Sequence, residues 1–443
     1  MILNTHEDNE IYRVLMEENE EDIIPKSKNG GKPDQYKRTM SYAYDELHTF
    51  RSYLKWMCVD QGSPSLAILS WLVFIFFTIG VPTISHFWLA CTSCDANHSR
   101  PYDGVVQFSL SSVASVSFLC LSQFVRKFGL RRFLFFDTLC EESETVREGY
   151  TVEFNYSLRL LSVFVLPCFA LNCAYKIWWY ASGASRIPFM GNPVLSDSIA
   201  CVMELCSWLY RTTVIFLVCI LFHLICHLQI LRLQDFAKVF DSACDIEYVL
   251  WEHLRIRKHL RIISHRYRAF VLWILILVTG SQFASLLITT KPGAIVDVYR
   301  SGELALCSIT LVTALLIILR SAAKITHKAQ AMNSLATKWH VCATLGTVIG
   351  PEIETPRPTI SGQNHPDDSE EDEEDAQSLN HVMHDPYDSF TFQKRQALVS
   401  YLENNRAGIT VYGFSLDRST LHSIFGVQLA LVLWLLGKTI GIS

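Results

Sequence analysis

The segment Ile199–Leu228, IACVMELCSWLYRTTVIFLVCILFHLICHL, decides the fold class, because it is an apolar run long enough to cross a lipid bilayer. Within this run stand a carboxylate, Glu204, and a guanidinium, Arg211. A charge at the bilayer centre costs at least about 2.5–3.5 kcal/mol, so such residues usually serve a function. The stretch predicts a membrane helix that carries polar sites.

Composition places the whole chain in the membrane class. Half of its 443 residues are hydrophobic and only 18% are charged, which is too apolar for a typical soluble protein. A spanning helix needs about 20 mostly apolar residues. Seven segments qualify: Leu66–Leu89, Val105–Phe124, Leu158–Tyr180, Ile199–Leu228, Phe270–Thr289, Leu304–Leu319 and Leu421–Leu436. The sequence therefore predicts an all-α membrane protein with seven transmembrane helices.

The distribution of lysine and arginine predicts the orientation of these spans, because cytoplasmic loops carry an excess of both. The regions after spans two and four carry six and eight of them, whereas the three loops on the opposite side carry four in all. This asymmetry predicts a cytoplasmic N-terminus and, after seven spans, an extracellular C-terminus. G-protein-coupled receptors have the reverse topology, so that class is disfavoured.

Four regions follow from these patterns. Residues 1–44 are predicted to be an acidic, disordered cytoplasmic N-terminus, and residues 45–346 to hold spans one to six with cytoplasmic helical extensions. Residues 347–388, which include PDDSEEDEED, are predicted to be a disordered acidic loop, followed in 389–443 by a cytoplasmic helix and span seven. The segment Leu233–Arg268 either prolongs span four below the membrane or lies on the lipid surface as a basic amphipathic helix.

Two modification sites fit this organisation. Asn97, in the sequon NHS, falls on a predicted extracellular loop and is a candidate for glycosylation, whereas Asn155, in NYS, falls on the cytoplasmic side. Ser369 precedes a run of acids and is a candidate for an acidophilic kinase. A solvated linker is the favoured interpretation of that segment.

The sequence contains no clear motif for enzymatic activity or for metal binding. The chain has no nucleotide-binding loop, HExxH motif or nucleophile elbow, so we expect no enzymatic activity and no cofactor. His223 and His227 stand four residues apart, as two metal ligands on a helix would, but no carboxylate is near them in sequence. Structural histidines are therefore favoured there. The mild net charge of -5 gives no reason to expect nucleic-acid binding.

The predicted outer halves of spans two to five carry polar residues that lipid contact does not explain. Lys176 and Glu204 lie about 6 Å and about 7 Å below the outer surface, so an ion pair between them is sterically reasonable. Arg211 lies about 10 Å deeper and, seven residues from Glu204, cannot contact it directly. Its candidate partners are Asn172, Ser281, Gln282, a backbone carbonyl or water. This pattern predicts a ligand or water cavity, with a purely structural set of buried charges as the alternative.

Several long stretches resemble one family. QFSLSSVASVSFLCLSQFVRKFGLRRF, YKIWWYASGASRIPF, KWHVCAT and FQKRQALVSYLENNRAGITVYGFSLDRSTLHSIFGVQ are similar to sequences of the plant gustatory-receptor-like proteins. The resemblance covers roughly Asp45–Ile442 apart from the acidic loop. That family is distantly related to the insect gustatory and odorant receptors. The relationship implies seven helices, a cytoplasmic N-terminus and assembly into tetrameric ligand-gated cation channels.

In the insect proteins the last helix lines the pore, and the ligand pocket lies in the outer half of each subunit. Span seven here carries Thr420, Ser423 and Gln428 among apolar residues, which predicts a narrow, mostly hydrophobic pore. The pore-facing glutamine of the insect pattern is missing, and Gln428 lies about two and a half turns earlier. The alternative is an ordinary oligomerisation helix in which Gln428 bonds its symmetry mates.

These observations together predict a ligand-responsive cation channel in the plasma membrane or an endomembrane. We expect it to be a homotetramer with an unknown small-molecule ligand. The predicted ligand site comprises Asn172, Lys176, Glu204, Arg211 and Gln282, and it biases a gate in span seven. A transporter of a small solute, or a non-conducting receptor or scaffold, are the alternatives.

Overall fold

The computed structural model describes residues 64–88, 100–133, 144–182, 193–241, 246–292, 296, 298–348, 389–405 and 407–440. Within these ranges seven helical segments are long and apolar enough to cross a membrane, which confirms the predicted number of spans. All described residues belong to one compact unit, residues 49–443. The predictions for Asn97, Ser369, residues 1–44 and residues 349–388 lie outside the described residues.

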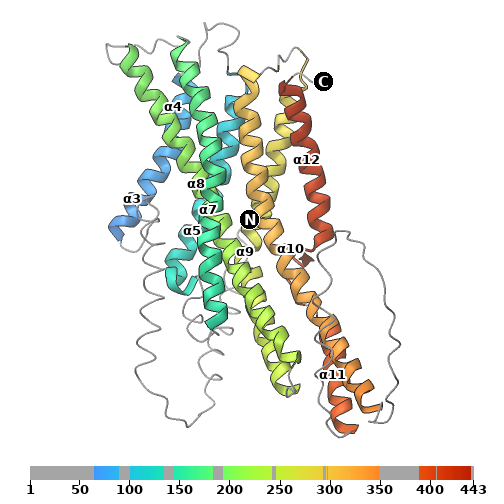
Figure 1. Cartoon of the computed structure of the whole chain (residues 1–443). Helices are drawn as coiled ribbons and strands as arrows, with labels where there is room; N and C mark the ends of the chain where they lie inside the picture. Colours follow the sequence, from blue (N-terminus) through green and yellow to red (C-terminus); the bar gives the residue numbers. More distant parts are fainter. Residues whose placement is uncertain are drawn as a thin grey trace, which may run out of the picture. The chain divides into compact units, whose positions relative to one another are not determined.

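The described chain is almost entirely helical (Figure 1). Its elements are α3 (Pro64–Ile75), the π-helical turn η1 (Phe76–Gly80), α4 (Val81–Trp88), α5 (Asp103–Phe133), α7 (Glu144–Ala181), α8 (Pro193–Ala237), the 3-10 turn η4 (Lys238–Asp241), α9 (Ile246–Thr289), α10 (Val298–Val348), α11 (Ser389–Asn404), β1 (Thr410–Val411), β2 (Phe414–Ser415) and α12 (Arg418–Ile440).

Helix α8 is the core of the bundle. It packs against α5, α7 and α10, and most of its membrane-spanning side chains are buried. Its second half, from Val214 to Leu228, is apolar nearly all round, and a helix of that kind is stable only when neighbours cover every face. Helix α12, in contrast, buries only one stripe, formed by Gln428, Val432, Leu435 and Thr439. The remaining surface of α12 is therefore open to lipid or to another chain.

The first span is interrupted by a π-turn that frees two carbonyl groups. At η1 the Val81 amide donates to the Phe76 carbonyl, and Pro82 has no N–H for the Thr78 carbonyl four residues earlier. Other helices use the freed oxygens. Ser111 Oγ donates to the Thr78 carbonyl at 2.7 Å, and Ser207 Oγ donates to the Phe77 carbonyl at 2.6 Å. The break thus ties the first span to α5 and α8.

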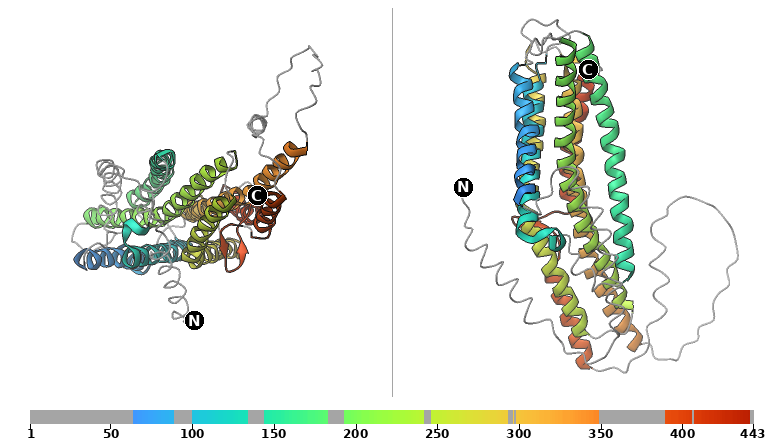
Figure 2. Two further views of the ribbon diagram at one scale, coloured as in Figure 1. Left: turned by 90° about the horizontal axis from the view of Figure 1, so that it is seen from below. Right: turned by 90° about the vertical axis from the view of Figure 1, so that its left-hand side faces the viewer.

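The structure corrects the prediction for Leu233–Arg268. Helix α8 ends at Ala237, and most of the segment instead forms the first part of α9, which runs without interruption into the fifth span. It is neither a continuation of span four nor a separate surface helix. Its apolar spacing arises because Val249, Ile256 and Leu260 are buried. Figure 2, right, shows the lower parts of α9, α10 and α11 together, beyond the point where α5 ends.

Helix α11 ends at Asn404, and a short hairpin follows it. Tyr412 (φ 48°) and Gly413 (φ 90°) form its two-residue turn, and positive φ at both positions is typical of a type I′ turn. Asp417 then caps α12, because it accepts from the Thr420 amide at 2.9 Å and the Thr420 hydroxyl at 2.8 Å. These hydrogen bonds lower the pKa of Asp417.

Gly408 allows the segment between α11 and β1 to lie close against α10. A Cβ on Gly408 would lie 2.9 Å from Thr326 Cγ2, and the neighbouring Ile409 amide donates to Thr326 Oγ1 at 3.1 Å. We expect Gly408→Ala to destabilise the purified protein by about 1–3 kcal/mol through overpacking. Adding Thr326→Ser should restore most of the loss in thermal unfolding, because serine removes the methyl group and keeps the hydroxyl. Gly280→Ala, where nothing lies within 4 Å, is the control; an equal loss there would contradict the clash.

Candidate functional site

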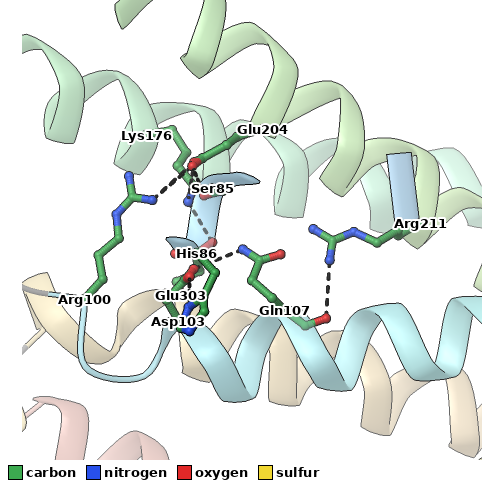
Figure 3. A network of polar contacts seen from close by, with 9 residues as sticks. All are labelled: Ser85, His86, Arg100, Asp103, Gln107, Lys176, Glu204, Arg211 and Glu303. Atoms are coloured by element: carbon green, nitrogen blue, oxygen red, sulfur yellow. Dashed lines mark hydrogen bonds and ion pairs between the residues drawn. The ribbon is translucent and has the colours of Figure 1, made fainter. Parts of the chain in front are cut away.

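A buried charge network joins α7, α8 and α10 (Figure 3), near the end of α7 and near the starts of α8 and α10. Lys176 Nζ on α7 lies 2.8 Å from Glu204 Oε2 on α8 and 2.9 Å from Glu303 Oε1 on α10. Lys176 is 2% exposed, so both carboxylates are needed to offset the cost of removing its ammonium from water. The ion pair between Lys176 and Glu204 that sequence depth predicts is thus present.

Arg100, just before α5, closes this network. Its NH1 lies 3.1 Å from Glu204 Oε1, and its guanidinium stacks on the ring of Trp179 with 3.6 Å to the centroid. Burial lowers the pKa of Arg100, but Glu204 and Glu303 outweigh burial and raise the pKa above its ordinary value. Ser85 Oγ of α4 also donates to Glu204. Three side chains from three parts of the chain therefore converge on one carboxylate.

A second set of contacts lies beside the first on α4 and α5. Asp103 Oδ1 accepts from Gln107 Nε2 at 3.0 Å, and Asp103 Oδ2 lies 3.3 Å from His86 Nδ1. Asp103 is buried, whereas the His86 side chain is 49% exposed. This pair therefore links the buried Asp103 carboxylate to the surface of the bundle.

Arg211 is buried without a carboxylate partner. It donates to the Ser111 hydroxyl at 3.1 Å and, through longer contacts, to the carbonyls of Ser207 at 3.3 Å and Gln107 at 3.5 Å. In the part of the chain that the structure describes, no carboxylate lies within ion-pair distance of this guanidinium. Of the partners considered from sequence, the backbone carbonyl is the one the structure shows.

One small cavity connects these groups. It is lined by Val81, Pro82, Ser85, Gln107, Lys176, Glu204, Ser207, Trp208, Arg211 and Glu303. About 10 Å³ of it is open to the centre of a water-sized sphere, which is room for about one water molecule. Glu204 and Arg211 therefore face the same cavity from positions about two turns apart on α8, although they do not touch.

Only three of the five predicted ligand-site residues meet here. Lys176, Glu204 and Arg211 line the cavity, whereas Asn172 and Gln282 are buried outside its lining. The Asn172 amide has no hydrogen-bond partner among the described residues. Glu303 and Arg100 are not among the predicted ligand-site residues. No sequence pattern could have identified them, because none indicates that the segments around these two residues pack next to α7.

The residues predicted to line a pore lie on different faces of α12. Ser423 is exposed and Thr420 is half-buried, but Gln428 is 2% exposed and donates through Nε2 to Thr279 Oγ1 of α9 at 2.9 Å. Gln428 therefore bonds another helix of the same chain. In the described ranges no cluster of three or more His, Cys, Asp or Glu side chains has the geometry of a metal site.

Comparison with known proteins bears on the family and on the fold. A family model described as "Protein of unknown function (DUF3537)" matches residues 45–427. The chain belongs to the DUF3537 family. A search of curated proteins found no match.

Two solved structures share the fold of this DUF3537 chain. One is the insect olfactory receptor OR5 from Machilis hrabei, with a TM-score of 0.52, 13% identity, and coverage of 88% of this chain and 99% of the receptor. The other is the same receptor in complex with eugenol, with a TM-score of 0.54, 11% identity, and coverage of 89% and 99%. The chain is thus a seven-helix membrane protein with an insect olfactory receptor-like fold.

Proposed function

We propose that this protein is a ligand-gated cation channel of the plant gustatory-receptor-like kind, assembled as a homotetramer with its N-terminus in the cytoplasm. The observation that carries the proposal is the buried cavity lined by charged groups from α7, α8 and α10, within a receptor-like fold. The receptor with the same fold has been solved with a small organic molecule, eugenol. The predicted orientation places the cavity in the extracellular half of the membrane.

Arg211 is the group that best fits a ligand in this cavity. Its guanidinium is desolvated and held by uncharged groups only, so an acceptor on a ligand would add a charge-assisted hydrogen bond. The cavity has room for about one water molecule, so a larger ligand must displace its walls. Those walls include α4 and α5, and binding would therefore move helices. Such movement is how ligand binding would reach the gate.

We assign the pore to the exposed face of α12 that carries Ser423, Gly426 and Ala430. Gln428 instead holds α12 against α9 through Thr279. A channel formed by four such faces would be narrow and mostly apolar, which is the type that gates by dewetting. Replacement of Ser423 by Leu should then reduce the unitary conductance, whereas Val427→Leu on the same exposed side is the conservative control.

Reconstitution of the purified protein in planar bilayers tests the proposal. We expect cation currents that appear when small molecules from a screened library are added, and a tetrameric particle by mass photometry. Electroneutral uptake of a solute without current would favour a transporter. A monomeric particle that neither conducts nor transports would contradict the proposal and favour a receptor or scaffold.

A further inference from the structure

A second polar cluster lies on the other half of α8, far from the charge network. Glu153 of α7 sits between two histidines of α8: its Oε1 is 3.1 Å from His223 Nε2, and its Oε2 is 3.7 Å from His227 Nε2. The carboxylate that the sequence lacked near these histidines is thus supplied by another helix. The three side chains are partly buried, with 22%, 27% and 15% exposure for Glu153, His223 and His227.

Ser321 of α10 determines which nitrogen of His223 carries its proton. The Ser321 hydroxyl donates to the Ile317 carbonyl at 2.6 Å, so its oxygen accepts from His223 Nδ1 at 2.8 Å. With its proton on Nδ1, a neutral His223 presents a bare lone pair on Nε2. That lone pair faces Oε1 of Glu153 at 3.1 Å. Two acceptors at this distance repel each other unless a cation lies between them.

We propose that Glu153, His223 and His227 form a proton-binding site, in which one proton is held between Glu153 Oε1 and His223 Nε2. This proton turns a repulsive contact into a charge-assisted hydrogen bond and joins α7 to α8. Through Ser321 the same imidazole also bonds α10. The site therefore ties three helices together in a manner that depends on the proton concentration.

The surroundings favour one proton at His223 over a second one at His227. Two positive charges disfavour a proton on His227. One is the ammonium of Lys324 on α10, and the other is a protonated imidazole of His223 four residues away. Glu153 lies 28 residues before the end of α7, or about 42 Å along the helix, which exceeds the roughly 30 Å hydrocarbon layer. The site is therefore within reach of water on the side of the membrane opposite the charge network.

Glu153→Gln distinguishes a bound proton from an ordinary hydrogen bond at this position, because the glutamine amide donates its own N–H to His223 Nε2. As pH rises through the ordinary histidine pKa of about 6.5, the unfolded chain would release this proton while the folded wild type keeps it. The stability of the folded wild type therefore falls with rising pH. We expect the melting temperature of the wild type in nanodiscs to fall between pH 5.5 and 8.5 by about 3 °C more than that of Glu153→Gln. His223→Gln should show the same reduced dependence.

His422→Gln, at an exposed position of α12, is the matched control and should keep the wild-type dependence on pH. Identical pH profiles for the wild type and Glu153→Gln would overturn the proposal. So would a wild-type melting temperature at pH 7.5 that falls with EDTA and rises with Zn²⁺, since the cluster would then hold a metal. If Glu153→Gln does not fold, the His223→Gln profile decides by the same criterion.

Discussion

Glu204→Ala is expected to lower the free energy of unfolding by about 3–5 kcal/mol, the cost of leaving one partner of a buried ion pair uncompensated. Glu204 accepts from Lys176, Arg100 and Ser85, so its loss leaves two buried cations with fewer acceptors. Glu303 still pairs with Lys176 at 2.9 Å, and Arg100 suffers the larger loss. Denaturant or thermal unfolding of the purified protein in detergent measures the effect.

The matched control is Glu403→Ala, which removes an exposed carboxylate from α11. A surface substitution of this kind usually changes stability by less than about 0.5 kcal/mol. If Glu204→Ala were as stable as Glu403→Ala, the network would not be buried from water as described. Glu204→Gln should be intermediate, because an amide oxygen still accepts from Ser85 and Arg100 but carries no charge.

Arg211→Met is expected to act in the opposite direction on stability and to weaken the response to ligand. Replacing a buried charge that has no opposite charge beside it by an apolar side chain of similar length removes its desolvation cost, so we expect the variant to be at least as stable as the wild type. Arg211 gains only a hydroxyl and two carbonyls in return for its desolvation. Loss of a hydrogen bond between this guanidinium and a ligand should cost about 1.5–3 kcal/mol, which raises the ligand concentration for half-maximal current about 10- to 100-fold.

The two variants together separate a structural network from a binding site. Unfolding experiments and dose–response curves should be run on the same preparations, so that a change in current is compared at equal amounts of folded protein. If Arg211→Met unfolds as readily as Glu204→Ala, Arg211 is a structural element. If it is stable and responds to ligand as the wild type does, the ligand binds elsewhere.

The spans and the pairing of Lys176 with Glu204 could be predicted because both depend on position along single helices. Hydropathy gives the length of a span, and a rise of 1.5 Å per residue gives the depth of a side chain within it. Lys176 near the end of α7 and Glu204 near the start of α8 therefore had to lie at similar levels. Their ion pair, at 2.8 Å, needed only that these two helices be neighbours.

The remaining partners depend on packing between segments that no sequence pattern connects. Arg100 reaches Glu204 across 104 positions of the chain, and Gln428 reaches Thr279 across 149. Trp179 has the sequence signal of an interfacial aromatic belt, because it lies near the end of a span, yet it is 1% exposed and lies beneath Arg100. A tryptophan near the end of a span has the same sequence signal in both situations. Only the position of the Arg100 segment distinguishes them.

Gating by a ligand at the buried cavity is tested most directly by the current that one screened compound evokes, recorded in parallel from the wild type and Arg211→Met in the same lipid. We predict a cation current in the wild type and a dose–response curve shifted at least about tenfold to higher concentration in the variant. Equal dose–response curves would contradict a ligand site at Arg211. Absence of any evoked current from correctly assembled wild-type protein would contradict the channel itself.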